Sequence, residues 1–467
     1  MAKDMLRVQL ASFNVGQHIS SDTLPDMTSW LVPTNTEEGK SGYASQDLHG
    51  SREAPDLYAI GFQEFALLPN ALAGWTETLR AALDREIRRT IRLHQSIVRP
   101  DHMYDPIEHG GGPENYSQVA EIVHGGMLLF VYARERRSQR HPHLPSAAER
   151  VKEVRMSSVG SGIFQLMGNK GAVGVRITLS PLTSGAQDDV YTFVCAHLAA
   201  HDYNVERRNL DWKNIVERLV FAADRLGFAP HLQPMSKTRS EKETMNHVQS
   251  IPTKPAAQNQ TPALDKNEYS VYDTHHLFVL GDLNYRVGSN VAGAPPSGGA
   301  TSPVTYPPMR TADIKMLARS NNPRRWAWLL PYDQLTLQHA TTPPRAFQSL
   351  HIPDLSMWNL APTYKYKVNA STKSSDVLSF KRLPGWPDRI LWSQKDEVHC
   401  ELYRSVMAMR VSDHKPITTI LNVPEQDRSR SIPLGEHGRR VDCGWIGPSV
   451  TSGLCCFYSE MAACRWL

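Results

Sequence analysis

The segment at residues 277–287, LFVLGDLNYRV, constrains the fold of this chain more than any other. Its apolar run is typical of a buried β-strand, and it stops abruptly at Gly281 and Asp282, with Asn284 close behind. An acid and an amide therefore emerge together where the strand leaves the core. Because a strand end holds side chains rigidly while the following loop leaves room for a substrate, we expect chemistry at this edge.

Four more strand-length apolar runs end in side chains that can bind a metal or move a proton. Residues 6–16, 55–65, 190–201 and 406–417 present in turn Asn14, Gln63 with Glu64, His197, and Asp413 with His414. Each pattern alone is typical of a polar turn after a core strand. Five such ends with a coherent set of ligands and acid–base groups predict one shared site instead.

The candidate ligands are mainly oxygen atoms, with imidazole and no thiolate. That set suits Mg²⁺ or Mn²⁺ better than Zn²⁺, and Mg²⁺ usually keeps positions for water and phosphate oxygens. The sequence therefore favours metal-assisted hydrolysis of a phosphoester. A nucleophilic serine or cysteine is disfavoured, because the chain has no Gly-x-Ser-x-Gly elbow and no Cys-x5-Arg loop.

As a group, these motifs resemble those of the inositol polyphosphate 5-phosphatases, within the DNase-I-like endonuclease/exonuclease/phosphatase superfamily. Two long motifs carry the resemblance, FVLGDLNYR at residues 278–286 and RLPGWPDRIL at residues 382–391. MGNKGAVGVR, YDQL, APTYKY and SDHKPI also match and occur in the family's order. The departures from the family pattern are Val279, Gly385 and Pro387, none of which has an expected catalytic role. The resemblance implies an enzyme.

The resemblance implies an α/β fold, a DNase-I-like four-layer sandwich in which two packed, mainly antiparallel or mixed sheets are flanked by helices. The residues themselves predict strands in the motif-bearing segments and also at residues 125–134 and 171–179. Apolar residues at helical spacing predict helices at residues 72–93 and 205–226.

We expect one catalytic domain over residues 1–424, because scattered motifs must converge on one site. Polar insertions at about 33–55, 231–270 and 288–309 are predicted to be surface loops. Residues 425–467 hold four of the six cysteines and are expected to be a disordered tail, with lipid attachment to the Cys455–Cys456 pair as the alternative. Two remaining cysteines make no disulfide framework, which indicates a reducing compartment.

For the metal and the attacking water, the resemblance implies four roles. Glu64 is expected to be the principal Mg²⁺ carboxylate, assisted by Asn14. Asp282 is expected to orient and deprotonate the water. Asn284 is expected to hold the scissile phosphate or that water.

The resemblance also implies how the phosphate is neutralised. His414 is expected to contact phosphate oxygens, with its ring oriented by Asp388. His197 is expected to contact a phosphate or the leaving group, and Asp413 to be a further ligand or a supporting acid. Metal and imidazolium together would remove the repulsion between a phosphate dianion and its nucleophile.

Substrate choice is expected to depend on Asn169 and Lys170 of GNKGAV, on Tyr364 and Lys365 of PTYKY, and on Arg389 of PDRIL. A lysine ammonium and a tyrosine hydroxyl suit a phosphate adjacent to the one being cleaved. In the family these motifs recognise the 4-phosphate, so the implied head group is a 4,5-bisphosphate. The alternative is that both lysines are solvated surface residues.

The predicted function is Mg²⁺-dependent hydrolysis of the 5-phosphate of phosphoinositides, foremost phosphatidylinositol 4,5-bisphosphate, with soluble inositol polyphosphates as further substrates. One alternative is a related metal-dependent phosphodiesterase of the nuclease or sphingomyelinase type, which is not expected to share PTYKY and RLPGWPDRIL. Another is a non-catalytic phosphoinositide-binding protein, which would have to lack a residue such as Glu64, Asp282 or His414. All three residues are present.

Charge and hydropathy limit the partners and the location. A net charge of +4 is too small to indicate a nucleic-acid partner. Arginines at positions 134, 136, 137 and 140 are candidates to meet an anionic leaflet, although such a run is more often a solvated face. No apolar run reaches the roughly 20 residues of a spanning helix, and no signal peptide is evident. We expect a cytoplasmic monomer, peripheral on the cytosolic face of membranes, that meets phosphoinositide head groups.

Overall fold

The computed structural model describes residues 5–32, 54–94, 113–137, 143–162, 169–182, 185–222, 268–288, 326–341, 344–358, 360–368, 378–379, 382–393 and 398–425. The three predicted insertions and the predicted tail lie outside the described residues except at their edges. The strands are β1 (Met5–Asn14), β2 (Leu57–Gln63), β3 (Tyr116–His124), β4 (Met127–Arg134), β5 (Val151–Gly160), β6 (Gly171–Leu179), β7 (Asp189–His197), β8 (His276–Asp282), β9 (Leu350–His351), β10 (Asp388–Ser393), β11 (His399–Ser405) and β12 (Ile417–Pro424). The helices are α1 (Thr28–Leu31), α2 (Leu68–Leu72), α3 (Glu77–Arg92), α5 (Ala147–Arg150), α6 (Val205–Arg218), the 3-10 helix η5 (Ala327–Tyr332) and α9 (Gln334–His339).

The described strands form two six-stranded sheets, in the orders β11-β12-β1-β2-β4-β3 and β5-β6-β7-β8-β10-β9. In each sheet one pair near the middle is parallel, β1 with β2 and β7 with β8. The other described neighbours run antiparallel. Since parallel strands end at the same edge, each sheet gathers two carboxyl-terminal strand ends in one place.

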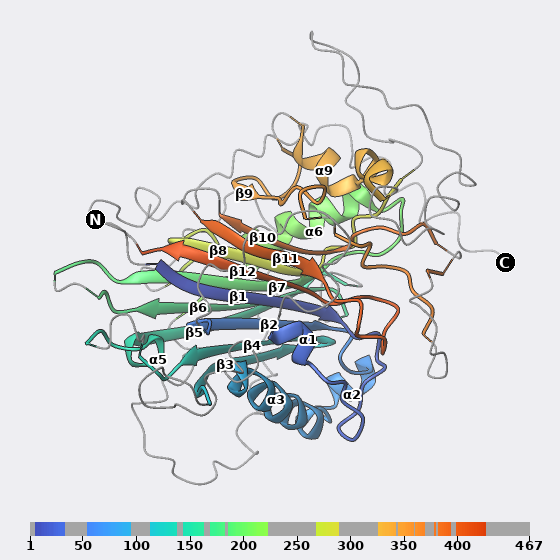
Figure 1. Cartoon of the computed structure of the whole chain (residues 1–467). Coiled ribbons are helices and arrows are strands. Elements are labelled where there is room, and N and C mark those ends of the chain that lie inside the picture. Colours follow the sequence, from blue (N-terminus) through green and yellow to red (C-terminus); the bar gives the residue numbers. More distant parts are fainter. Residues whose placement is uncertain are drawn as a thin grey trace.

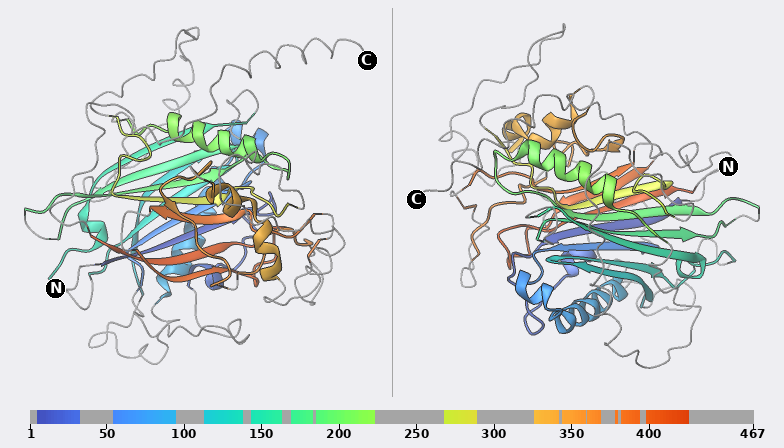
Figure 2. Two further views of the ribbon diagram at one scale, coloured as in Figure 1. Left: turned by 90° about the horizontal axis from the view of Figure 1, so that it is seen from above. Right: turned by 180° about the vertical axis from the view of Figure 1, so that it is seen from behind.

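The sheets pack face to face, and helices cover their outer faces (Figure 1, Figure 2). Val8 of β1 and Phe278 of β8 belong to the apolar layer between the sheets. On the outer face of the first sheet, Leu83 and Ile87 of α3 complete a second apolar layer, and Trp212 of α6 packs on the outer face of the second sheet. The predicted sandwich of two sheets between helices is confirmed.

Strand β1 shows why its sequence is apolar almost throughout. Val8 and Leu10 face the other sheet, whereas Ala11 and Phe13 face the helical layer. Successive side chains of a strand point to opposite faces, and here both faces are covered. Burying each large apolar side chain contributes about 1.5–3 kcal/mol, so this strand is a strong part of the core.

Two helix boundaries differ from the predictions. The helix predicted at residues 72–93 begins at Glu77, because Gly74 has a φ of +75° that interrupts the helical backbone. The helix predicted at residues 205–226 ends at Arg218, and its extended continuation pairs with the backbone of a later segment. None of the helices among the described residues is long and apolar enough to cross a bilayer.

The strand predicted at residues 406–417 is wrong. Residues 406–416 form the turn between the antiparallel strands β11 and β12, which begins at Ile417, so His414 lies in a turn and not at a strand end. The apolar signal came in part from Met409, which packs in the layer outside the first sheet. The turn is held from inside, since the buried Lys415 Nζ donates to the carbonyls of Met407 at 3.0 Å and Met409 at 2.9 Å.

The arginines proposed to meet a membrane are paired with carboxylates where the structure describes them. Arg134 is buried and makes two hydrogen bonds to Glu114, of 2.8 and 2.9 Å. Arg136 lies 3.8 Å from Glu114, and Arg137 makes a two-pronged contact with Glu149. The fourth arginine of the run lies outside the described residues. This part of the run is therefore charge-balanced rather than a free basic patch.

Candidate active site

The candidate site lies where the carboxyl ends of the two parallel strand pairs meet. Asn14 ends β1, Glu64 follows β2, and His197 and Asp282 end β7 and β8. Asn14 Nδ2 donates to Asp282 Oδ2 at 2.9 Å, which joins the two sheets at this edge. His197 Nε2 lies 3.4 Å from Asp282 Oδ2 and 3.7 Å from Glu64 Oε1. Four side chains from distant parts of the sequence thus form one cluster.

The backbone of the Gly-Asp-x-Asn segment is shaped for this cluster. Gly281 has a φ of +143°, and a Cβ there would lie 1.9 Å from the Ala196 carbonyl oxygen, so only glycine lets β8 run this close to β7. Asp282 Oδ1 accepts from the Asn284 N–H at 3.0 Å. Asn284 adopts a left-handed φ of +59°, which asparagine tolerates, and its Nδ2 donates to the Leu198 carbonyl at 3.0 Å.

A second carboxylate and imidazole complete the cluster. Asp388 begins β10 directly opposite Asp282 in the ladder. Its Oδ2 lies 2.9 Å from His414 Nδ1 and accepts from the Thr363 hydroxyl at 2.6 Å. The other ring nitrogen of His414, Nε2, is 3.9 Å from Asp282 Oδ2. Asp388 therefore orients the imidazole of His414 toward Asp282.

Burial and neighbouring charge shift the pKa values of these groups. Burial raises the pKa of Asp282, but the charge of His414 and the hydrogen bond and charge of His197 outweigh it, and the pKa stands well below its usual value. Burial lowers the pKa of His414, but the carboxylates of Asp388 and Asp282 outweigh it and raise the pKa. For Asp388, burial raises the pKa and His414 offsets only part of that rise. Asp282 and His414 thus favour an ionised carboxylate beside an imidazolium.

The cluster has the donor set of a hard divalent cation. Carboxylate oxygens of Asp282 and Asp388 lie within 4.8 Å of each other, and Asp388 Oδ1 is a buried acceptor with no hydrogen-bond partner. Asp388 is fully buried, whereas the Glu64 side chain is 40% exposed, so Glu64 is the carboxylate that an entering cation meets first. Oxygen-rich sites of this kind suit Mg²⁺-like ions, and the residues present fit the predicted group.

Lys170 reaches the cluster from the turn before β6. The register of β6 places Gly171 opposite His197, and Lys170 Nζ contacts His197 Nε2. Burial lowers the pKa of Lys170, and the carboxylates of Asp282 and Glu64 oppose that shift. Asn169, its neighbour in the same turn, is exposed.

Tyr364 and Lys365 approach the cluster from the side of His414. The rings of Tyr364 and His414 have centroids 4.5 Å apart, and the two residues also pair through their backbones. Lys365 Nζ donates to Asp413 Oδ2 at 2.5 Å. Burial lowers the pKa of Lys365, but the bond to Asp413 outweighs it and raises the pKa. Asp413 therefore holds Lys365 near the cluster.

Arg389 is the predicted site residue that the structure does not bring to the cluster. Its Nη2 donates to Asp333 Oδ1 at 2.6 Å, and both side chains are 0% exposed. Its Nε donates to the Trp386 carbonyl at 2.5 Å. Consecutive strand residues point to opposite faces, so the neighbour of Asp388 cannot share its direction. Arg389 instead ties β10 to the start of α9.

The sequence predictions missed Thr363 and Arg286. Thr363 holds Asp388, as described above. Arg286 Nη2 donates to Asn284 Oδ1, its Nε donates to the Asn284 main-chain oxygen at 3.2 Å, and its Cζ lies 4.2 Å from the centre of the Tyr364 ring. Both residues lie inside the quoted motifs. A motif alone does not say which of its polar residues touch a ligand and which touch a neighbour.

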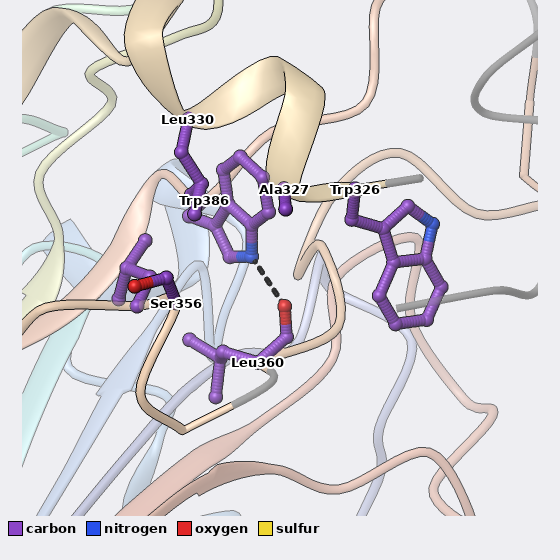
Figure 3. Close-up of a pocket in the computed structure, with 7 residues that line it drawn as sticks. Trp326, Ala327, Leu330, Ser356, Leu360 and Trp386 are labelled. Atoms are coloured by element: carbon purple, nitrogen blue, oxygen red, sulfur yellow. Dashed lines mark hydrogen bonds between the residues drawn. The ribbon is translucent and has the colours of Figure 1, made fainter. Parts of the chain in front are cut away.

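A small pocket of about 20 Å³ lies apart from these groups. Trp386 Nε1 donates to the Leu360 carbonyl at 2.9 Å across it (Figure 3). The residues that line it are Trp326, Ala327, Leu330, Leu355, Ser356, Leu360 and Trp386. None of them is charged or belongs to the cluster, so we assign this cavity no role in the chemistry.

Curated relatives are similar to most of this chain. It is 25% identical over 377 residues to the type II inositol 1,4,5-trisphosphate 5-phosphatase of Mus musculus, covering 80% of this chain and 27% of that protein. Human synaptojanin-2 is 23% identical, with 90% of this chain and 23% of that protein covered. The type I inositol polyphosphate 5-phosphatase 8 of Arabidopsis thaliana is 24% identical, with 88% and 74% covered. The chain thus spans about a quarter of the first two relatives and most of the third.

A solved structure and a family model complete the comparison. The crystal structure of the inositol polyphosphate 5-phosphatase domain of SPsynaptojanin, in complex with inositol (1,4)-bisphosphate and calcium ion, matches with a TM-score of 0.53 and 20% identity. The match covers 90% of this chain and 84% of that one, and it shows a shared fold. Residues 11–420 match the model of Endonuclease/Exonuclease/phosphatase family 2. The chain therefore belongs to endonuclease/exonuclease/phosphatase family 2, and its resemblance to the inositol polyphosphate 5-phosphatases is confirmed.

Proposed function

We propose that this chain is a Mg²⁺-dependent phosphatase that removes the 5-phosphate from phosphoinositides, foremost phosphatidylinositol 4,5-bisphosphate, and leaves phosphatidylinositol 4-phosphate. Soluble inositol polyphosphates are further substrates. The observation that carries the proposal is the pair of Asp282 and His414, 3.9 Å apart and beside the accessible carboxylate of Glu64. The names of the curated relatives support the position of the phosphate that is cleaved.

Asp282 orients the attacking water in this mechanism. Its low pKa keeps it ionised, so it accepts the water proton only as the bond to phosphorus forms. Asn284 has one amide N–H on Leu198 and a second for the phosphate or the water. When bound by Glu64 and Asn14, Mg²⁺ supplies a Lewis acid that polarises the phosphate oxygens.

Two histidines are proposed to contact the substrate beside Asp282. His414, whose raised pKa favours the imidazolium, contacts the oxygens of the phosphate being cleaved. His197 contacts a phosphate oxygen or the departing inositol oxygen as a neutral ring, because burial and the charge of the adjacent Lys170 lower its pKa.

The 4-phosphate is expected to be recognised by Lys170, Tyr364 and Lys365. Because Lys365 is held by Asp413, a substrate phosphate has to share or replace that contact. Lys365→Ala is therefore expected to weaken the selectivity for 4,5-bisphosphate over 5-monophosphate head groups. We further propose that the protein acts as a monomer, peripheral on the cytosolic face of membranes.

The test is phosphate release from a panel of phosphoinositides and soluble inositol phosphates, measured with Mg²⁺ and with a chelator. Release from 5-phosphorylated compounds only, abolished by the chelator, is the expected result. Sphingomyelin and DNA belong in the panel, since cleavage of either with inert phosphoinositides would indicate a phosphodiesterase. Binding of head groups without any release would indicate a non-catalytic protein.

A further inference from the structure

We infer that Arg286 is a positioning residue that links the Asn284 amide to the side of the site formed by Tyr364 and His414. The inference rests on the proposed phosphatase function. Arg286 is 9% exposed and lies just after the strand end that carries Asp282. Its guanidinium contacts residues from two separate motifs, and no role for it follows from the mechanism above.

The first contact sets the direction of the Asn284 side chain. Arg286 Nη2 donates to Asn284 Oδ1 and Nε to the Asn284 main-chain oxygen, while Asn284 Nδ2 donates to the Leu198 carbonyl. A guanidinium has only donors, so it can hold only the oxygen end of the amide. The nitrogen end therefore points away from Arg286, and it keeps one N–H for a phosphate or a water.

The second contact reaches the imidazole side. The Cζ of Arg286 lies 4.2 Å from the Tyr364 ring centre, which is within cation–π range. That ring in turn packs against the His414 imidazole, with centroids 4.5 Å apart. Asn284, Arg286, Tyr364 and His414 thus form one continuous chain of contacts around the scissile phosphate.

Arg286 is itself fixed by the start of α9. Its backbone N–H donates to Gln334 Oε1 at 2.9 Å, and its carbonyl accepts from the Gln334 N–H at 2.9 Å. Gln334 Oε1 also accepts from Arg208 Nη2 at 2.6 Å. An arginine anchored through its backbone can transmit that position to the side chains at its tip.

Arg286→Met keeps the length of the side chain and removes the planar set of guanidinium donors and the positive charge. Misplacing reacting groups by about 1 Å costs on the order of a hundredfold in rate, so we expect kcat for soluble inositol 1,4,5-trisphosphate to fall about 30- to 100-fold. KM should change by less than about threefold, because the substrate phosphates are bound by other residues. Arg286→Lys keeps the positive charge but not the planar set of guanidinium donors. This variant should therefore recover less than about a third of the kcat that Arg286→Met loses.

The decisive measurement is a double-mutant cycle with Asn284→Ala. If Arg286 acts through Asn284, adding Arg286→Met to Asn284→Ala should lower kcat by less than about threefold further. Arg176→Met is the matched control, since the Arg176 guanidinium lies 3.9 Å from the Tyr269 ring and is equally buried, on the outer face of another strand. That variant should leave kcat unchanged. If Arg286→Met does not fold, Arg286→Lys takes its place in the cycle.

A readout that needs no turnover separates this inference from the proposed function. With ¹⁵N-asparagine labelling, the Asn284 side-chain amide signal is identified by its loss in Asn284→Ala. The chemical shift of this signal should change in the Arg286 variant and remain unchanged in Arg176→Met. The inference would be overturned by an unchanged chemical shift in the Arg286 variant. It would also be overturned if the kcat losses of the Arg286 variant and Asn284→Ala multiplied in the double variant. If the wild-type protein were inactive but the chemical shift still changed in the Arg286 variant, only the proposed function would be overturned.

Discussion

The parallel strands β7 and β8 carry a cluster of aspartate and histidine at each end, and the two clusters differ in how completely their carboxylates are partnered. At the carboxyl end lie His197 and Asp282, in the candidate site. At the amino end, Asp189 begins β7 and His276 begins β8, with His275 just before it. The residue types are the same, so residue type alone does not distinguish a site from a structural cluster.

At the amino end, one buried carboxylate is matched by several donors. Asp189 Oδ1 accepts from the Val190 N–H at 3.0 Å and lies 3.2 Å from His275 Nδ1 and 3.1 Å from His276 Nε2. Asp189 Oδ2 accepts from the Tyr191 hydroxyl at 2.8 Å. Burial raises the pKa of Asp189, but the bonds from both histidines outweigh it and lower the pKa. Both oxygens of this carboxylate are therefore partnered.

At the carboxyl end, the carboxylate oxygens are not all partnered. Asp282 and Asp388 are both buried, Glu64 adds a third carboxylate, and Asp388 Oδ1 has no hydrogen-bond partner. A buried carboxylate without enough partners is costly, and a divalent cation would lower that cost. An unpartnered carboxylate oxygen beside an accessible acid therefore distinguishes the candidate site from the amino-end cluster.

The largest expected effect is at the carboxyl end. Asp282→Asn should lower kcat about a thousandfold or more, because the ionised acceptor for the water proton is lost. Its melting temperature should stay within a few degrees of the wild type, because the replacement has the same size and removes the repulsion between Asp282 and Asp388, which offsets the loss of a charged partner for His414 and His197. Initial rates at saturating substrate and a thermal melt measure both quantities. Near-normal phosphate release from the folded variant would refute the role of Asp282.

The amino-end cluster should respond in the opposite way. Asp189→Asn should lower the free energy of unfolding by about 3 kcal/mol, because two buried histidines lose a charged partner. Its kcat should stay within about twofold of the wild type, since this cluster lies at the opposite end of β7 and β8 from the candidate site. The matched control is Asp188→Asn, which removes an exposed ion pair with Lys152 and should cost less than about 1 kcal/mol. Urea unfolding gives the first value, and a large loss of kcat in folded Asp189→Asn would contradict the assignment.

The smallest effect is the pH dependence of that stability difference. The pKa of Asp189 in the folded protein lies below the ordinary value of 3.8. A lowered carboxyl pKa stabilises the folded state above pH 3.8, and that stability is lost as the pH falls below 3.8 toward the folded pKa. The gap in unfolding free energy between wild type and Asp189→Asn should therefore be constant above about pH 5 and shrink below pH 4. If the difference in unfolding free energy instead grew as the pH fell, the pKa of Asp189 would not be lowered in the folded protein.

Much of the site could be predicted because its strands are local features of the sequence. The apolar runs before Asn14, Glu64, His197 and Asp282 are buried on both faces, so they are recognisable without knowing their partners. Parallel pairing then brings their polar ends to one edge. The prediction of residues around His414 as a strand failed because buried turn residues are apolar for packing reasons unrelated to a sheet.

The remaining features of the candidate site depend on side-chain directions, which cannot be read from the sequence. Arg389 and Asp388 are neighbours in the chain, yet one points to Asp333 and the other to His414. The role of Arg286 likewise follows from where Tyr364 lies in space, and the two are far apart in sequence. The partners of the carboxylates at each strand end are also set by the tertiary structure. The amino-end cluster therefore could not be distinguished from the candidate site on the sequence alone.

We propose that the carboxyl-end cluster, with its unpartnered Asp388 oxygen and accessible Glu64, holds a divalent cation, and that the amino-end cluster does not. Calorimetric titration of Mg²⁺ into the wild type, Glu64→Gln and Asp189→Asn, without substrate, tests it most directly. We predict similar dissociation constants for the wild type and Asp189→Asn, and binding at least about tenfold weaker for Glu64→Gln. Equal affinity in Glu64→Gln, or lost binding in folded Asp189→Asn, would contradict the claim.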